Sequence, residues 1–191
     1  MVAVAEIRTG RVLLRAWREE DLDPFAALCA DPEVMRHFPA TLTRAECAEA
    51  MERIDAHFER RGFGLWAMEL PGLSPFIGFV GLAVPRFEAR FAPCVEIGWR
   101  IERAHWGHGY VTEAARAVLH RGFTVHGLAE VVSFTVPGNF RSRAVMERLG
   151  MRHHPEEDFD HPLLPEGHPM RRHVLYRLRR EELLSAPPGG P

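Results

Sequence analysis

Residues 96–114, EIGWRIERAHWGHGYVTEA, hold the pattern in the chain that is best suited to binding an anion. A predicted strand runs into a loop with Gly107 and Gly109, and the loop opens a predicted helix. The first backbone amides of a helix have no intrahelical partner and lie at the positive end of its dipole. Glycine lets a ligand approach the backbone closely, because it has no Cβ atom. The pattern therefore favours a pyrophosphate-binding turn, although a tight turn without a ligand has the same features.

Two common nucleotide-binding motifs do not fit this segment. The chain contains no GxxxxGK[ST] sequence, and Thr112 occupies the third glycine position of a GxGxxG pattern. A P-loop and a dinucleotide-binding turn are therefore both disfavoured.

The segment resembles the acetyl-CoA-binding motif of the GNAT acetyltransferase superfamily, in its RimJ/RimL-like branch. The branch phrase W-G-x-G-Y-x-T-E-A matches residues 106–114, WGHGYVTEA. Residues 139–151, NFRSRAVMERLGM, resemble the family's N-x-x-S-x-x-x-x-E-K-L-G-F, and residues 173–178, HVLYRL, resemble its closing H-x-L-Y-x-L. The three motifs stand in the family's order, and the resemblance extends over about residues 10–180.

The resemblance implies roles for individual residues. Those that would present backbone groups to the pantetheine arm of acetyl-CoA are Trp99, Arg100 and Ile101. Those that would cradle the pyrophosphate are Gly107, His108, Gly109, Tyr110, Val111 and Thr112. Asn139 would hydrogen-bond the pantetheine or the backbone beside it, and Ser142 would lie near the thioester sulfur. The alternative is that Asn139 only caps a helix and that Ser142 only bonds backbone in its first turn.

The predicted catalytic residues are Glu96 and Ser142. The tyrosine that serves many superfamily members as general acid is replaced here by Met146, and a glutamate used by some N-terminal acetyltransferases maps near Phe134. Glu96 remains as the base for the attacking amine, and Ser142 remains as the donor to the leaving thiolate. Alternatively, Glu96 is a structural carboxylate paired with Arg100 or another arginine, and water takes the proton.

Residues 153–173 contain five of the eleven histidines of the chain. Their spacing matches no zinc pattern, so we expect no metal. The proline-rich loop is expected to lie over the acceptor groove or in a dimer contact, and His161 or His168 is a candidate for touching the substrate.

The elements that must position these residues follow from hydrophobic periodicity, caps and breakers. The expected strands cover residues 10–18, 65–70, 76–84, 94–101, 130–136 and 173–179, with a possible further strand near 151–154. The expected helices cover residues 19–29, 33–37, 43–61, 109–123 and 141–149. Thr43 and Glu46 are expected to form a capping box, and Gly62 is expected to end that helix. The expected apolar face of the helix over 109–123 consists of Val111, Ala115, Val118 and Leu119. This order predicts an α/β GNAT fold, in which a mixed central sheet has an antiparallel N-terminal part and flanking helices.

Composition limits the other possibilities. The chain has 191 residues and a formal net charge of -2, and no basic patch argues for nucleic acid. No apolar run approaches the roughly 20 residues that span a membrane, and no secretory signal is visible, so a cytoplasmic protein is expected. The three cysteines are widely spaced and are expected to be buried thiols. We expect one domain over residues 1–185 and a disordered tail over 186–191.

The sequence therefore predicts an acetyl-CoA-dependent N-acetyltransferase that acts on a primary amine without a metal. By resemblance, the acceptor is the α-amino group of a protein or peptide, and a homodimer is possible. The alternative acceptor is a small amine such as a polyamine, an amino acid or an antibiotic. A non-catalytic acyl-CoA-binding module is a further alternative.

Overall fold

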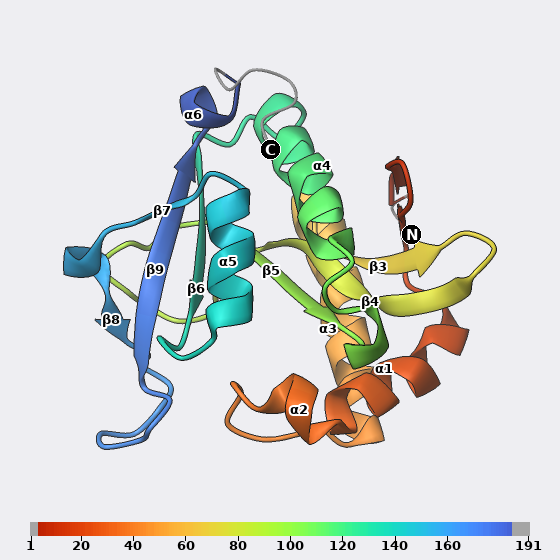
Figure 1. Cartoon of the computed structure of the whole chain (residues 1–191), viewed down its shortest axis with the longest axis horizontal. Coiled ribbons are helices and arrows are strands. Elements are labelled where there is room, and N and C mark those ends of the chain that lie inside the picture. Colours follow the sequence, from red (N-terminus) through yellow and green to blue (C-terminus); the bar gives the residue numbers. More distant parts are fainter. Residues whose placement is uncertain (1–3, 185–191) are drawn as a thin grey trace. The chain divides into compact units, whose positions relative to one another are not determined.

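The computed structural model of the chain describes residues 4–184, and the expected tail at 186–191 lies outside them (Figure 1). The chain forms two compact units. The first comprises the chain up to Ala83 together with Gly98–Val118, and the second comprises Val84–Ile97 and the chain from Leu119 onward. Strand β5 (Glu96–Ile101) and helix α4 (Tyr110–Thr124) pass from one unit into the other. The single domain over 1–185 stays a prediction.

The first unit is built on antiparallel strands in the order β1-β2-β3-β4, followed by the C-terminal part of β5. Their bounds are β1 Ile7–Arg8, β2 Leu13–Arg15, β3 Leu65–Leu70 and β4 Ser74–Ala83. The strand expected over 10–18 is confined to Leu13–Arg15. Residues 9–12 turn instead: the Thr9 amide donates to the Val12 carbonyl at 3.0 Å, and the Val12 amide donates to the Thr9 hydroxyl at 3.0 Å.

Three helices belong to the first unit. They are α1 (Leu22–Ala30), preceded by a 3-10 turn at Glu19–Asp21, α2 (Pro32–Met35) and α3 (Arg44–Arg61). Helix α1 packs against α3 and β4. The capping box at the start of α3 is confirmed, since the Thr43 hydroxyl accepts from the Glu46 amide and the Glu46 carboxylate accepts from the Thr43 amide. Gly62, at φ 75°, ends the helix.

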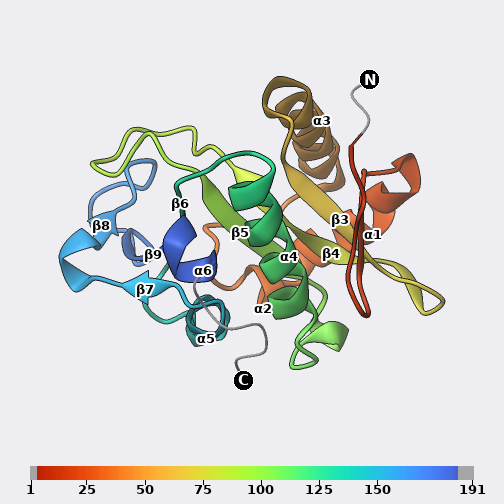
Figure 2. The ribbon, with the colours of Figure 1, turned by 90° about the horizontal axis from the view of Figure 1, so that it is seen from above.

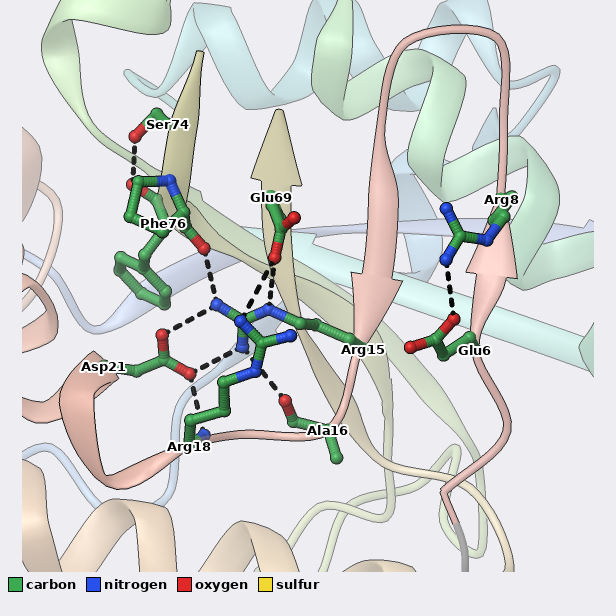
Figure 3. A network of polar contacts seen from close by, with 10 residues as sticks. Glu6, Arg8, Arg15, Ala16, Arg18, Asp21, Glu69, Ser74 and Phe76 are labelled. Carbon is green, nitrogen blue, oxygen red and sulfur yellow. Dashed lines mark hydrogen bonds and ion pairs between the residues drawn. The ribbon is translucent and has the colours of Figure 1, made fainter. Parts of the chain in front are cut away.

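A buried ionic network holds the start of α1 to the sheet (Figure 3). The guanidinium of Arg15 donates to both carboxylate oxygens of Asp21, and its Nε donates to Glu69 at 2.7 Å. It also donates to the backbone carbonyls of Ala16 and Pro75. A buried charge is tolerated only when it is paired and hydrogen-bonded, and Arg15 meets that condition.

Gly78 of β4 is a point of close backbone approach. A Cβ atom at this position would lie 2.1 Å from the carbonyl oxygen of Arg100 in β5, and Gly78 has φ 141°. The next pairing is regular, since the Glu102 amide donates to the Ile77 carbonyl at 2.9 Å. Glycine is therefore required for the C-terminal part of β5 to lie this close to β4.

The second unit has the strand order β5-β6-β9-β7, with β8 paired to β9. The further bounds are β6 Glu130–Thr135, β7 Arg152–His153, β8 Phe159–Asp160 and β9 Arg172–Arg179. Strands β5 and β6 are parallel and the other pairs are antiparallel, so the mixed sheet is confirmed. Helix α5 (Phe140–Arg148) lies beside β6, and α6 (Arg180–Leu184) follows β9 (Figure 1).

The apolar face expected on α4 is confirmed. Val111, Ala115 and Val118 are buried in the part of α4 that belongs to the first unit, and Leu119 is buried in the second. A 3-10 turn at Arg103–His105 precedes this helix, and another lies at Pro155–Glu157. Among residues 4–184, no helix has the length and apolar character needed to cross a membrane.

Candidate active site

The loop before α4 is an open glycine turn. Gly107 and Gly109 both have φ +79°, a backbone conformation that favours glycine. A Cβ atom at Gly107 would meet nothing within 4 Å. The Trp106 indole holds the loop to the end of β5, because it donates to the Ile101 carbonyl at 3.0 Å. The turn is therefore fixed at its entry and has free space in front of Gly107.

The first amides of α4 have no partner within the helix. The Glu113 amide donates to the Gly109 carbonyl at 3.0 Å, which is the first bond of the helix. The amides of Tyr110, Val111 and Thr112 come before it, and such amides have no intrahelical partner. Donors at the positive end of a helix beside an open glycine turn fit a pyrophosphate. The role of these amides toward the pyrophosphate of acetyl-CoA stays a prediction.

The side chains around the turn come from both sides of the loop. The rings of His108 and Tyr110 stack at 5.5 Å, and the guanidinium of Arg11 lies 4.8 Å from the Tyr110 ring centre. Arg11 also donates to the His108 carbonyl at 3.0 Å and to the Glu113 carboxylate at 2.7 Å. Sequence reasoning missed Arg11, because no local pattern links it to a helix about a hundred residues further on.

The predicted pantetheine residues lie in the C-terminal part of β5. Arg100 donates from Nη1 to the Cys29 sulfur at 2.9 Å, and its guanidinium lies 4.3 Å from the ring centre of Phe38 and 5.5 Å from that of Phe79. Trp99 is partly exposed and Ile101 is buried. Their backbone role toward pantetheine stays a prediction.

Glu96 lies at the N-terminal end of β5, within the second unit, where it pairs with Val132 of β6. Its side chain is only partly exposed, and burial raises its pKa to about 8. No hydrogen bond or ion pair of this carboxylate is found among residues 4–184, so the alternative of a structural ion pair has no support there. A carboxyl group that titrates close to neutral pH suits a general base.

An aromatic cluster occupies the same face of the sheet as Glu96. Paired residues share a face, and alternate residues of a strand return to it. The pair Glu96–Val132 and the pair Phe134–Leu175 therefore point to one side. The aromatic cluster on that side consists of Phe87, Phe91, Phe134, Phe159, His161 and His173. Figure 2 shows the 84–95 segment beside β8 and β9, which bring these residues together.

Burial in the cluster favours the neutral form of two histidines, His161 and His173. The rings of His161 and His173 lie 5.0 Å apart, and burial lowers the pKa of both. His173 Nδ1 lies 3.1 Å from the Arg171 carbonyl, so the neutral ring donates there. His168, the other candidate for touching the substrate, instead accepts the Met170 amide within its own turn. Among the described residues, no group of three potential ligands lies close enough together to hold a metal.

A cavity of about 460 Å³ adjoins the cluster within the second unit. Its lining is mainly apolar, with one carboxylate from Glu88, and it includes Phe87 and Cys94. Residues 84–94 alone provide the lining, and no motif in the sequence points to them.

Asn139 and Ser142 lie at the start of α5. The Asn139 side-chain oxygen accepts the Ser142 amide at 3.3 Å, and its amide group donates to the Thr135 hydroxyl at 2.9 Å. Asn139 thus caps α5, which is compatible with a contact to the cofactor, and that contact stays a prediction. Met146 is buried, and the hydroxyl of Tyr176 is engaged by Glu147 and Arg143. Neither residue offers a free general acid.

Comparison with known proteins agrees with this geometry. The Acetyltransferase (GNAT) domain family matches residues 11–152. The chain is 30% identical to the uncharacterized protein YkkB of Bacillus subtilis over 80% of this chain and 88% of the relative. It is 32% identical to the FsC-acetyl coenzyme A-N(2)-transacetylase of Aspergillus fumigatus, over 93% of this chain and 77% of the relative.

A solved structure shares the fold. RimJ of Mycobacterium smegmatis in complex with CoA-disulfide superposes with a TM-score of 0.73 at 23% identity, covering 94% of this chain and 88% of that chain. GNAT enzymes use acetyl-CoA, and the glycine turn before α4 suits its pyrophosphate. The chain belongs to the GNAT N-acetyltransferase family.

Proposed function

We propose that this enzyme transfers the acetyl group of acetyl-CoA directly to the α-amino group of a protein or peptide. The observation that carries the proposal is the open glycine turn at Gly107 and Gly109, followed by the first amides of α4, which have no partner within the helix. Backbone amides of residues 109–112 would hold the pyrophosphate, and Trp99, Arg100 and Ile101 would hold the pantetheine. Acetyl-CoA supplies the activated acetyl thioester, and the protein supplies positioning and proton transfer.

Glu96 is the proposed proton acceptor. An α-amino group has a pKa of about 8, so it is mostly protonated at neutral pH and must lose a proton before it attacks. The pKa of Glu96, also about 8, allows it to take that proton directly or through a water. Backbone amides would polarise the thioester carbonyl. Ser142 would donate to the departing thiolate, and Asn139 would hold the backbone that presents Ser142.

A small-molecule amine is the second candidate acceptor. It is favoured by the 32% identity to a relative whose name describes an N(2)-transacetylase that uses acetyl coenzyme A. The mainly apolar cavity lined by residues 84–94, with Glu88 as its carboxylate, suits an amine that carries an apolar body.

An acceptor screen with the purified protein separates these candidates. The panel contains peptides with a free α-amino group, the same peptides with a blocked α-amino group and a free lysine, and small amines. Release of free thiol and the mass of the product are both measured. We expect acetylation of the free α-amino peptides. A product formed only from small amines would favour the second candidate, whereas acetyl-CoA binding without thiol release would show a binding module.

The remaining parts of the proposal concern the localisation, the partners and the oligomeric state of the protein. We infer a cytoplasmic enzyme without a nucleic-acid or membrane partner, and a homodimer is the assembly to test by light scattering.

A further inference from the structure

Hydrogen bonds connect the turn between β1 and β2 with the turn that precedes α4. One carboxylate oxygen of Glu113 accepts from the Thr9 hydroxyl at 2.6 Å and from the Arg11 amide at 2.8 Å. The other accepts from Arg11 Nε at 2.7 Å. Arg11 Nη1 then reaches the His108 carbonyl at 3.0 Å. These contacts all lie within the first unit, and they link the hairpin turn to the predicted pyrophosphate cradle.

The contact between Arg11 and His108 sets the direction of an amide. In a trans peptide the C=O of one residue and the N–H of the next point in opposite directions. Since Arg11 holds the His108 carbonyl on the hairpin side, the Gly109 N–H points away from the hairpin. Gly109 is one of the predicted donors to the pyrophosphate, and its φ of +79° belongs to the same turn.

Arg11 also removes an electrostatic conflict. Glu113 lies in the first turn of α4, where its negative charge would repel an anion bound at the helix start. Burial acts to raise the pKa of Glu113, but hydrogen bonds from Thr9 and Arg11 outweigh it and place the pKa below its ordinary value. The carboxylate therefore stays charged at neutral pH, and Arg11 compensates that charge at 2.7 Å.

We propose that Arg11 is a positioning residue for the phosphates of acetyl-CoA, acting through Glu113 and the His108 carbonyl. The proposal rests on the proposed function. In this proposal, the N-terminal hairpin orients the Gly109 amide and compensates the negative charge of Glu113 in the first turn of α4. The Arg11 side chain is 52% exposed, so its ion pair contributes little to stability, and this role is distinct from holding the fold together.

The test compares two acyl donors. One is acetyl-CoA, and the other is the acetyl thioester of N-acetylcysteamine, which has no phosphate. For Arg11→Met, we expect the preference for acetyl-CoA, taken as the ratio of the two kcat/KM values, to fall about tenfold or more, as loss of charge-assisted hydrogen bonds would produce. The fall should appear mainly in the KM for acetyl-CoA. The control is Arg8→Met in the same hairpin, where Arg8 forms an exposed ion pair with Glu6, and its ratio should stay at the wild-type value.

A general loss of structure would give a different result. If Arg11→Met lowers both donors equally, or leaves the ratio unchanged, the positioning role is wrong. Arg11→Lys keeps the charge without the planar fork and should restore only part of the ratio, which gives a second measurement if the methionine variant is unstable. The double variant with Glu113→Gln should lose less than the sum of the single losses. A wild-type protein without any preference for acetyl-CoA would instead refute the proposed function.

Discussion

Both carboxylate oxygens of Asp21 accept hydrogen bonds from the guanidinium of Arg15, at 2.7 and 2.8 Å. Each side chain is only 2% exposed. Glu69 supplies a second carboxylate at 2.7 Å, so the buried cation has two acidic partners. Desolvation opposes the charge of Arg15, but these partners outweigh it and raise its pKa. The network joins β2, β3 and the start of α1.

Asp21→Asn should destabilise the protein strongly. The change keeps the shape but leaves part of the charge of Arg15 without its partner, and breaking a buried ion pair costs about 3–5 kcal/mol. Urea unfolding followed by circular dichroism measures the loss. Glu6→Gln is the control, because its ion pair with Arg8 is exposed and should change stability by no more than about 0.5 kcal/mol. Equal losses in the two variants would contradict a structural role for Asp21.

Gly109→Pro should abolish stabilisation by acetyl-CoA. Proline removes the amide donor and cannot adopt the φ of +79° at this position. Acetyl-CoA raises the melting temperature only if it binds the folded state, so the shift with ligand should vanish. Gly72→Pro is a matched control, because Gly72 has φ +77° in the turn between β3 and β4. An undiminished ligand shift in a folded Gly109 variant would place the phosphates elsewhere.

Glu96→Gln should lower kcat by about 10²-fold or more, within the range for loss of a general base. The KM for acetyl-CoA should change little, since the cradle consists of backbone amides. In the wild type the rate should rise with pH through about 8, where Glu96 loses its proton. Steady-state kinetics on the true acceptor between pH 6 and about 9 measure both effects. A variant with near wild-type kcat would make Glu96 structural and water the acceptor.

The stability of the protein should also depend on Glu96. Its folded pKa of about 8 lies above the ordinary 4.5, so the folded state keeps a proton that the unfolded chain releases. Stability is therefore highest below pH 4.5 with respect to this group and falls as pH rises to about 8, by an amount on the order of 5 kcal/mol. Glu96→Gln should flatten this part of the stability profile. An unchanged slope would show that Glu96 ionises normally in the folded state.

Ser142→Ala should have a smaller effect than Glu96→Gln. Loss of one hydrogen bond to the leaving thiolate, worth about 1–1.5 kcal/mol, corresponds to about a tenfold lower kcat. The loss of kcat should be smaller for acyl donors with a more acidic thiol, because their thiolate leaves with less help from a hydrogen bond. If the defect is the same for all thiol leaving groups, Ser142 serves only the start of α5.

Features that depend on residues close together in the chain could be predicted from the sequence. The capping box at Thr43, the stop at Gly62 and the glycine turn before α4 all depend on residues within a few positions of one another. Strands β1 and β8 have two residues each, which is too short to give a period. Arg11 and Glu113, which form an ion pair, are 102 positions apart in the sequence, so only the folded chain brings them together.

The same distinction applies to the candidate site. Glu96 was recognised from its place before the loop, but its raised pKa comes from burial in the folded chain. The aromatic cluster joins the 84–95 segment to β6, β8 and β9, and none of these segments carries a motif that identifies the others. The histidine-rich segment suggested a role through composition, whereas its structure pairs His161 with His173 among phenylalanines.

Gly78 limits how this enzyme can be diversified. The obstacle to a side chain there is the main-chain carbonyl of Arg100, so no change of a neighbouring side chain can make room. In a mutant library selected for new acceptors, position 78 should remain glycine even though it lies outside the acetyl-CoA motif. Variation at Phe38, an exposed side chain whose ring centre lies 4.3 Å from the Arg100 guanidinium, meets no such barrier. Selection should therefore accept changes at Phe38 while it keeps glycine at position 78.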